Sequence, residues 1–350
     1  MDIRKIDKNF LQNAAVPEGS VFYGVTEPPF SLYGVFYDEK DRRFLRMPQK
    51  IADEVNSGVG VLCRNTSGGR VRFSTDSAHL TLAAKYGVLN KMTHMPLSGS
   101  GGFALCENTE KGEIFLCSLF PDFSEETGFV RTVPLAGKGM RNYTIYFPLY
   151  NDVNDLALGF AAGARVGKGA PYRPIKPVVY YGSSITQGGC ASRADTDYQG
   201  FICKRNNVDF INLGFSGNAK GEERMADYLA TLDCSALVID YDHNAPSAAF
   251  LRETHCKFYE RYRKQRPDTP VVFVSKPNYY RDPDAPERLK IIRETYKKAL
   301  AAGDKVYFVH GKSLFGKEWM NCEVDGCHPT DYGFYRMSLA IGRALDRILR

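Results

Sequence analysis

Five short apolar runs recur in the second half of this 350-residue chain, and longer stretches of helical periodicity separate them. The runs read PVVYYG, VDFINLG, SALVIDY, TPVVFVS and KVYFVHG, and the stretches between or after them include GEERMADYLATL, APERLKIIRETYKKALAAG and TDYGFYRMSLAIGRALDRILR. Strands that alternate with helices of this length need right-handed crossovers and form a parallel sheet covered on both faces. The pattern predicts an open, doubly wound α/β domain with about five parallel strands over residues 171–350.

The first half has a different periodicity. GRVRFSTDS and AHLTLAAKY are predicted to be strands joined by a turn, with Val71 and Phe73 on one face and Arg70 and Arg72 on the other. The segments GGFALCEN, GEIFLCSLF and RNYTIYFPLY continue this pattern, and DLALGFAAGARV reads as one more strand. Because no long amphipathic helix lies between these runs, they indicate an antiparallel all-β sandwich.

Length supports two domains, because the chain exceeds the usual size of a single hydrophobic core. The segment GKGAPYRPIKP, residues 167–177, is the best linker candidate, since it is rich in proline and glycine and ends where the periodicity changes. We therefore expect a sandwich domain over residues 1–170 and an α/β domain over residues 171–350.

Composition excludes several classes of protein. No apolar run is long enough to span a membrane, and the amino terminus MDIRKIDKNF lacks the apolar core of a secretion signal, although a trimmed chain would look the same. The chain as given is therefore expected to be cytoplasmic, with no membrane partner. The formal charge of +6 is modest, and Lys and Arg are scattered among Asp and Glu, so nucleic acid is not an expected partner.

Nine cysteines form an odd number with irregular spacing, which favours free thiols over a disulfide framework. The stretch CEVDGCHP places Cys322, Cys327 and His328 close together, but this spacing fits no common zinc pattern. We expect neither a metal nor a cofactor.

Polar residues follow the carboxyl ends of the predicted strands, which is the edge where ligands bind in such sheets. These residues include Ser183 and Ser184 after the first strand, the turn SGN at 216–218 after the second, and Asn244 after the third. The sequence DGCHP at 325–329 stands before the last helix. One edge thus holds a serine, a glycine turn, an asparagine, and a histidine with a carboxylate three residues upstream. These are the parts of acyl transfer through a serine: nucleophile, oxyanion donors, base and orienting group.

Each part also has a plain structural explanation. Glycine and serine after a strand are more often a turn or a helix cap than a nucleophile. Asn244 could be a loop residue, and His328 before Pro329 could be a surface histidine at a helix entrance. The conjunction of all the parts at successive strand ends favours the catalytic interpretation.

On these residues the chain resembles the SGNH hydrolases, also called the GDSL lipase/esterase family, which are named for residues in four sequence blocks. GSSIT matches the first block, which assigns the nucleophile to Ser184 and leaves Ser183 in the place usually held by an aspartate. NLGFSGN resembles the glycine block and indicates Gly217, and DYDHNA matches the asparagine block loosely and indicates Asn244.

The last block, Asp-x-x-His-Pro, matches DGCHP completely. The resemblance therefore implies a triad of Ser184, His328 and Asp325, with an oxyanion hole formed by Ser184, Gly217 and Asn244. It also implies a flavodoxin-like fold for this domain.

The first half of the chain resembles, at EPPFSLYGVFYDEKDRRFLRMP, the small β-rich domain that precedes the hydrolase domain in a bacterial SGNH subgroup. The layout, with a jelly-roll-like sandwich in front, is similar to that of some carbohydrate esterases that remove acetyl groups. The resemblance implies hydrolysis of short-chain, acetyl esters on a small molecule or an oligosaccharide, without a cofactor.

Other residues near the same edge have weaker assignments. His243 is a rival base, which we interpret as a residue of the pocket wall. Tyr279, Tyr280 and Trp319 are candidates for substrate binding, because aromatic side chains in loops can stack on sugar rings. His79, His94 and His255 are expected to lie away from the edge, and His310, which ends a predicted strand, is interpreted as a structural residue.

Two alternatives stay open at this point. An acyl-thioesterase or lysophospholipase of the same fold would use the same residues. A non-catalytic carbohydrate-binding protein would use the sandwich alone. The sequence leaves open the oligomeric state and whether the sandwich contributes to the active site.

Overall fold

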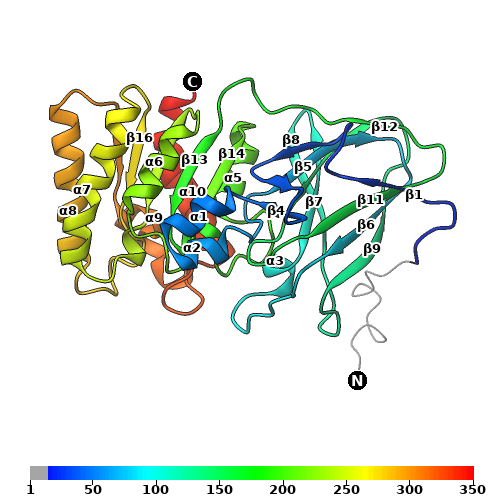
Figure 1. Cartoon of the computed structure of the whole chain (residues 1–350), viewed down its shortest axis with the longest axis horizontal. Coiled ribbons are helices and arrows are strands. Elements are labelled where there is room, and N and C mark those ends of the chain that lie inside the picture. Colours follow the sequence, from blue (N-terminus) through cyan, green and yellow to red (C-terminus); the bar gives the residue numbers. More distant parts are fainter. Residues whose placement is uncertain (1–14) are drawn as a thin grey trace.

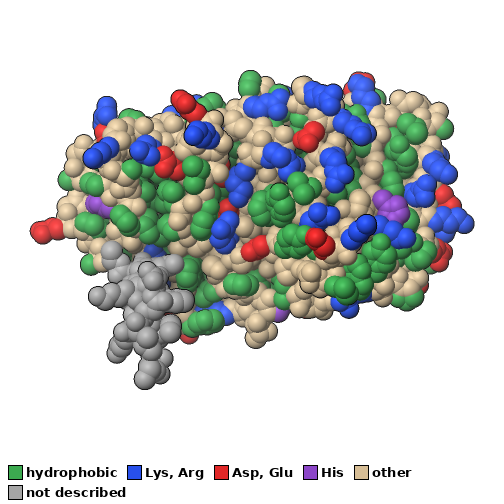
Figure 2. All heavy atoms as spheres, turned by 180° about the vertical axis from the view of Figure 1, so that it is seen from behind, with side chains coloured by type: hydrophobic (Ala, Val, Ile, Leu, Met, Phe, Trp, Pro, Cys, Tyr) green, Lys and Arg blue, Asp and Glu red, His purple; other side chains and the backbone are tan. Residues whose placement is uncertain are grey.

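The computed structural model describes residues 15–350, so the amino-terminal stretch used above to judge the secretion signal lies outside the described residues. Figure 1 shows a sheet flanked by helices beside a β-rich part. No helix in residues 15–350 has the length and apolar character needed to cross a membrane. Lys and Arg side chains are spread over the face shown in Figure 2, with Asp and Glu between them. All nine cysteines carry free thiols.

The C-terminal part contains a five-stranded parallel sheet in the order β14-β13-β15-β16-β17. The strands are β13 (Val178–Gly182), β14 (Phe210–Gly214), β15 (Ala236–Asp240), β16 (Val271–Val274) and β17 (Val306–Val309). This is the flavodoxin-like order, so the predicted doubly wound domain is confirmed. The last residues of the three neighbouring strands, Gly182, Gly214 and Asp240, lie in register, and their carboxyl ends meet at one edge.

Helices cover both faces of this sheet (Figure 1). Leu237 and Ile239 of β15 pack in the core under α6 (Glu223–Thr231), α7 (Ala248–Gln265) and α8 (Ala285–Ala301). Val238 points to the other core, under α5 (Tyr198–Asn206) and α10 (Asp331–Ile348). Every residue of β15 is buried, which explains why the run is continuously apolar rather than alternating.

The N-terminal part is a sandwich of two antiparallel sheets, as predicted. The four-stranded sheet has the order β1-β11-β6-β9, and the six-stranded sheet has the order β12-β5-β10-β7-β8 with β2 beside β5. The strands are β1 (Val21–Gly24), β2 (Ser31–Tyr33), β5 (Arg70–Thr75), β6 (His79–Lys85), β7 (Phe103–Thr109), β8 (Gly112–Leu119), β9 (Gly128–Pro134), β10 (Arg141–Tyr146), β11 (Asp155–Phe160) and β12 (Val166–Lys168). The prediction of a single strand over residues 155–166 is wrong, because β11 and β12 lie in different sheets.

Strand β5 connects the sandwich to the rest of the molecule. Val71 and Phe73 point into the sandwich core, whereas Arg70 and Arg72 lie on the opposite face, as expected from the alternation. These two arginines are nevertheless buried, at 0% and 4% exposure. The C-terminal domain covers that face, so their charges meet partners there instead of water.

The contacts of the two arginines join the domains. Arg70 forms an ion pair with Asp209, and its guanidinium lies 3.8 Å from the ring centroid of Phe210. Arg72 stacks 3.7 Å above the ring of Tyr172, inside the segment expected to be a linker. That segment begins within β12 and is tied to the α/β domain by the bond from Arg173 N to the Asn207 carbonyl. It is therefore packed against both domains.

Two short helices of the first half, α1 (Gln49–Val55) and α2 (Ser57–Leu62), were not predicted. Ala52 and Val59 belong to the same buried cluster as Met225 of α6, so these helices extend the helical layer of the α/β domain. Each spans fewer than two full heptads, which is too short for a periodic signal. A two-stranded hairpin of β3 (Phe36–Asp38) and β4 (Arg43–Leu45), three residues each, precedes these helices.

Candidate active site

The turn after β13 carries the two serines, and its close approach to the sheet requires glycine at residue 182. A Cβ atom on Gly182 would lie 2.1 Å from Thr186 Oγ1 and 2.5 Å from the Asp240 carbonyl oxygen. Without it, the chain turns directly from β13 into the short helix α4 (Ser184–Gln187). This turn places Ser184 above the carboxyl edge of the sheet.

The structure gives the two serines different tasks. Ser183 caps α4, and its Oγ accepts a hydrogen bond from the Ile185 N–H at 3.2 Å. Ser184 directs its Oγ to His328 Nε2 at 2.9 Å. Both side chains are buried, with Ser184 6% exposed. Only Ser184 is thus paired with a group that can remove its proton.

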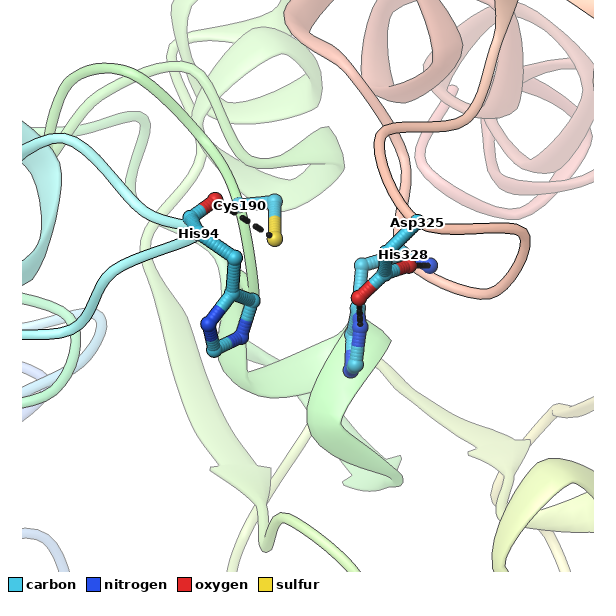
Figure 3. Close-up of side chains that lie close together, drawn as sticks. All are labelled: His94, Cys190, Asp325 and His328. Carbon is cyan, nitrogen blue, oxygen red and sulfur yellow. Dashed lines mark hydrogen bonds and ion pairs between the residues drawn. The ribbon is translucent and has the colours of Figure 1, made fainter.

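His328 and Asp325 come from the loop before α10 and point toward each other (Figure 3). His328 Nδ1 lies 2.8 Å from Asp325 Oδ2, and Asp325 Oδ1 accepts the backbone N–H groups of His328 at 2.7 Å and Cys327 at 3.0 Å. Burial alone would raise the pKa of Asp325, but the backbone and side-chain hydrogen bonds from His328 outweigh it and lower the pKa to about 2. The carboxylate is therefore ionised and can hold the imidazole with Nε2 toward Ser184.

Two further side chains fix this loop. Asn278 Nδ2 donates to the carbonyl oxygens of Gly326 at 3.1 Å and Cys327 at 3.3 Å. His243 Nε2 lies 2.8 Å from Cys327 Sγ. Burial lowers the pKa of His243 to about 3, and within residues 15–350 its imidazole makes no hydrogen bond to Ser184. His243 therefore supports the loop that carries His328.

Each of the three predicted oxyanion donors, Ser184, Gly217 and Asn244, keeps an N–H group available to a ligand. The backbone N–H groups of Ser184 and Gly217 have no hydrogen-bond acceptor among the described residues. Gly217 has a φ of 67° and open space on the side where a Cβ would lie, so its backbone can face a ligand. Asn244 Nδ2 donates one of its hydrogens to the Phe215 carbonyl at 2.9 Å, which orients the amide and leaves its second N–H free for a substrate.

The turn that carries Asn244, η3 (Asp242–Asn244), is held by a buried arginine of α8. Arg288 donates to the carbonyl oxygens of Asp242 and Ala245, both at 2.9 Å, and forms an ion pair with the Asp242 carboxylate at 3.2 Å. The sequence contains no motif that would mark Arg288, because it lies in the first turn of an ordinary amphipathic helix.

Asp240, the last residue of β15, lies beneath the serine turn and is buried. Its Oδ2 accepts hydrogen bonds from Thr186 Oγ1 and the Tyr198 hydroxyl, both at 3.1 Å. Burial raises the pKa of Asp240 to about 7, although these hydrogen bonds oppose the shift. A carboxyl with a raised pKa stabilises the fold while it is protonated, and this contribution is lost as the pH rises through about 7.

We therefore expect Asp240→Asn to gain stability relative to the wild type as the pH rises. The amide oxygen can accept both hydrogen bonds but cannot ionise. As the pH rises from about 4 to about 7, the free energy of unfolding of the wild type should fall relative to that of the variant by at most about 1.4 kcal/mol per pH unit, and the difference should then level off. Urea denaturation at several pH values measures this difference, and one that does not change with pH would contradict the expectation.

The sandwich domain also reaches the active site. The Tyr150 hydroxyl donates to the Ser184 carbonyl at 3.1 Å. The ring of His94 lies opposite that of His328 (Figure 3), with 6.0 Å between the centroids. The expectation that His94 lies away from the edge is therefore wrong, because the packing of the sandwich on the α/β domain brings it there. His79 and His255 do lie elsewhere, bonded to Ser20 and Thr295 respectively.

The candidate aromatic residues form their own cluster. Tyr280 stacks on Trp319 with 5.6 Å between the ring centroids, and the guanidinium of Arg281 lies 5.2 Å from the Trp319 ring. Tyr279 packs against His310 at 5.6 Å. None of these rings lines the cavity beside His94, which is described below. A role for Tyr279, Tyr280 and Trp319 in substrate binding stays a prediction.

His94, Cys190, Asp325 and His328 have potential metal-binding atoms within 4.8 Å of one another (Figure 3). However, both ring nitrogens of His328 are engaged, Nδ1 with Asp325 and Nε2 with Ser184. The hydrogen bonds of this group fit a hydrolytic triad better than a metal centre. Cys322, from the pattern considered in the sequence, instead donates to the Glu318 carbonyl.

Comparisons with known sequences assign both halves of the chain. The GDSL-like Lipase/Acylhydrolase family matches residues 175–346, and the family described as the N-terminus of Esterase_SGNH_hydro-type matches residues 21–166. A search of curated proteins found no match.

Solved structures resemble the whole chain. The structure of a candidate GDSL-like lipase from Bacteroides ovatus ATCC 8483 has 25% identity and a TM-score of 0.84, covering 94% of this chain and 98% of that one. A salicylyl-acyltransferase from a tetracycline biosynthetic pathway has 17% identity and a TM-score of 0.76, with coverages of 95% and 98%. An acetyl xylan esterase from the rumen bacterium Butyrivibrio proteoclasticus has 13% identity and a TM-score of 0.58, with coverages of 93% and 98%. The last two likenesses concern the fold alone.

The chain belongs to the SGNH (GDSL-like) hydrolase family, with an N-terminal domain of the type found in SGNH esterases. It is a carboxylic ester hydrolase.

Proposed function

We propose that this hydrolase cleaves short-chain esters, acetyl esters in particular, on a carbohydrate, with Ser184 as nucleophile, His328 as base and Asp325 as orienting carboxylate. One observation carries the proposal: a continuous chain of hydrogen bonds runs from Ser184 Oγ through the imidazole to Asp325, with distances of 2.9 and 2.8 Å. Nucleophile, base and orienter in this geometry suit acyl transfer through a serine.

The first half of the reaction forms an acyl-enzyme. His328 Nε2 accepts the proton of Ser184 as Oγ attacks the ester carbonyl carbon, and Asp325 stabilises the imidazolium that results. The N–H groups of Ser184 and Gly217 and the amide of Asn244 bind the oxygen on which negative charge develops. The tetrahedral intermediate then breaks its bond to the alcohol oxygen, which leaves with the proton from His328.

The second half uses water in place of the serine. His328 removes a proton from water, the hydroxide attacks the acyl carbon, and the same donors stabilise the second oxyanion. Ser184 leaves with the proton from His328, and the acid is released. Every proton that moves passes through His328 Nε2, which is why the tautomer fixed by Asp325 matters.

We infer the substrate class from the resemblance in domain layout to carbohydrate esterases. The fold of an acetyl xylan esterase is similar to that of this chain over 98% of that protein's length. The aromatic residues near the carboxyl edge are compatible with a sugar ligand. A thioesterase or a lysophospholipase would need the same triad, so the acyl and alcohol groups must be decided by experiment.

Loss of one oxyanion donor should slow the reaction without changing the nucleophile. We expect Asn244→Ala to lower kcat about 10²-fold or more, because the remaining two N–H groups leave the oxyanion incompletely bound. Steady-state hydrolysis of p-nitrophenyl acetate measures the effect. A variant that keeps wild-type kcat would exclude Asn244 from the oxyanion hole.

Acetate release from acetylated xylo-oligosaccharides tests the proposed function, with Ser184→Ala as the comparison. The wild type should release acetate, and the variant should not. A panel of p-nitrophenyl esters from acetyl to decanoyl, together with acetyl thioesters, tests the acyl group. Preference for long chains or thioesters would contradict the proposed acetylesterase. Binding of the oligosaccharide without acetate release would favour a carbohydrate-binding protein.

A further inference from the structure

A cavity of about 850 Å³ opens next to the triad, between the two domains. The sandwich contributes residues 91–97 and Phe123, and the α/β domain contributes Cys190, Ser192, Val324, Thr330 and Asp331. An acetyl group would occupy a small fraction of this space, which falls within the range that holds drug-sized ligands. The cavity must therefore take the other part of the ester or remain filled with water.

The position of the cavity decides which part of the ester it holds. The leaving alcohol oxygen must receive its proton from His328 Nε2, so the alcohol lies on the His328 side of Ser184. The cavity is on that side, because Val324 and Thr330 belong to the loop that carries His328. Neither the triad residues nor Gly217 and Asn244 line the cavity, and it approaches the triad through His94, whose ring centroid lies 6.0 Å from that of His328.

The charged groups of the cavity already have partners. The Asp331 carboxylate accepts the Ser192 N–H and the Thr196 hydroxyl, both at 2.8 Å. The Lys91 ammonium donates to the Phe123 carbonyl at 2.5 Å. Much of the remaining wall is apolar, with Met92, Met95 and Leu97 among its residues. A neutral ligand with an apolar face fits these walls better than an ion does.

Two side chains are available to such a ligand. The imidazole of His94 is exposed and has no hydrogen-bond partner among the described residues, while its carbonyl is fixed by the Cys190 thiol at 3.4 Å. Phe123 lines the same cavity and is 79% exposed. A neutral imidazole can donate or accept a hydrogen bond, and an exposed ring can stack on the apolar face of a sugar.

We propose that the sandwich domain binds the alcohol half of the ester: His94 forms a hydrogen bond to a hydroxyl or ring oxygen of a neutral sugar, and Phe123 stacks on its apolar face. This inference rests on the proposed function, because it assumes that Ser184 attacks the ester and His328 protonates the alcohol. It adds two residues that determine specificity, and both come from the sandwich domain, whereas the triad lies in the α/β domain.

The test compares two acetyl esters that differ only in the alcohol: a monoacetylated methyl xylopyranoside and ethyl acetate. For His94→Ala, the ratio of kcat/KM for the xyloside to kcat/KM for ethyl acetate should fall about 10- to 100-fold, as expected when a site loses a polar contact to its substrate. For Phe123→Ala the ratio should fall about 3- to 10-fold, in line with the loss of a stacking contact. His79→Ala, a histidine change elsewhere in the same domain, is the matched control.

A fall of about threefold or more for His94→Ala, absent from His79→Ala, supports the proposal, since smaller changes lie near the scatter of surface substitutions. A smaller fall overturns it. The ratio of kcat/KM for p-nitrophenyl butyrate to kcat/KM for p-nitrophenyl acetate is measured as well. If His94→Ala changes this ratio by a comparable factor, the proposal is also overturned, because the cavity would then hold the acyl half of the ester. If His94→Ala does not fold, Phe123→Ala decides by the same threshold, since its exposed ring contributes little to the core. A wild type with no Ser184-dependent activity on either ester refutes the proposed function itself.

Discussion

His328→Ala is expected to lower kcat for p-nitrophenyl acetate by about 10⁴-fold or more, close to the effect of removing the nucleophile itself. Without the imidazole, no group in the described part of the chain lies within hydrogen-bond distance of Ser184 Oγ to accept its proton as it attacks. The residual rate should come from the oxyanion donors and substrate binding. Steady-state kinetics with enzyme of confirmed fold measures the loss.

His243→Ala is the informative comparison, because His243 was the rival base in the sequence. Its imidazole contacts Cys327, not Ser184, so its removal should disturb the loop without removing the base. The kcat of His243→Ala should therefore exceed that of His328→Ala by orders of magnitude. The reverse order would make His243 the base and refute the assignment of His328.

Asp325→Asn is expected to lower kcat by about 10³- to 10⁴-fold. The amide oxygen can still accept the backbone N–H groups of Cys327 and His328, so the loop should keep its shape. The substitution removes the negative charge that stabilises the imidazolium. It also removes the carboxylate oxygen that accepts the hydrogen bond from Nδ1–H of His328. A variant with nearly wild-type kcat would show that the carboxylate has no role in the reaction.

The pH dependence of stability gives a second measurement on the same variant. The pKa of Asp325 is lowered to about 2 in the folded protein, below its value in an unfolded chain. The ionised carboxyl therefore stabilises the fold above about pH 4, and this contribution is lost as the pH falls through about 2. Asp325→Asn should be less stable than the wild type near neutral pH, and this difference should shrink on acidification. Thermal unfolding of both proteins at a series of acidic pH values measures this difference in stability.

The α/β domain could be predicted because each of its strands can be recognised from its own run of residues. The run SALVIDY is apolar throughout since β15 is buried on both faces, and the helices that follow are long enough to show a period. Once the strands are parallel, their carboxyl ends must lie together, so residues as distant as Ser184 and Asn244 could be assigned to one edge. The structure puts Ser184, His328 and Asp325 within hydrogen-bond distance.

The contributions of the sandwich domain to this site could not be predicted. His94 and Tyr150 reach Ser184 and His328 only because the six-stranded sheet packs on the α/β domain. The alternation in β5 showed that Arg70 and Arg72 share a face, but nothing local distinguishes an arginine in water from one over a Phe or Tyr ring. Arg288 was missed for the same reason, because its partners are backbone carbonyl groups distant in sequence.

The central claim is that Ser184, and not its neighbour Ser183, is the nucleophile. Labelling with a fluorophosphonate probe, followed by peptide mapping by mass spectrometry, tests it most directly. The structure pairs Ser184 Oγ with His328 and uses Ser183 Oγ as a helix cap, so the label should be found on Ser184 in the wild type and in Ser183→Ala, and should be absent from Ser184→Ala. Label on Ser183, or label that persists in Ser184→Ala, would contradict the account.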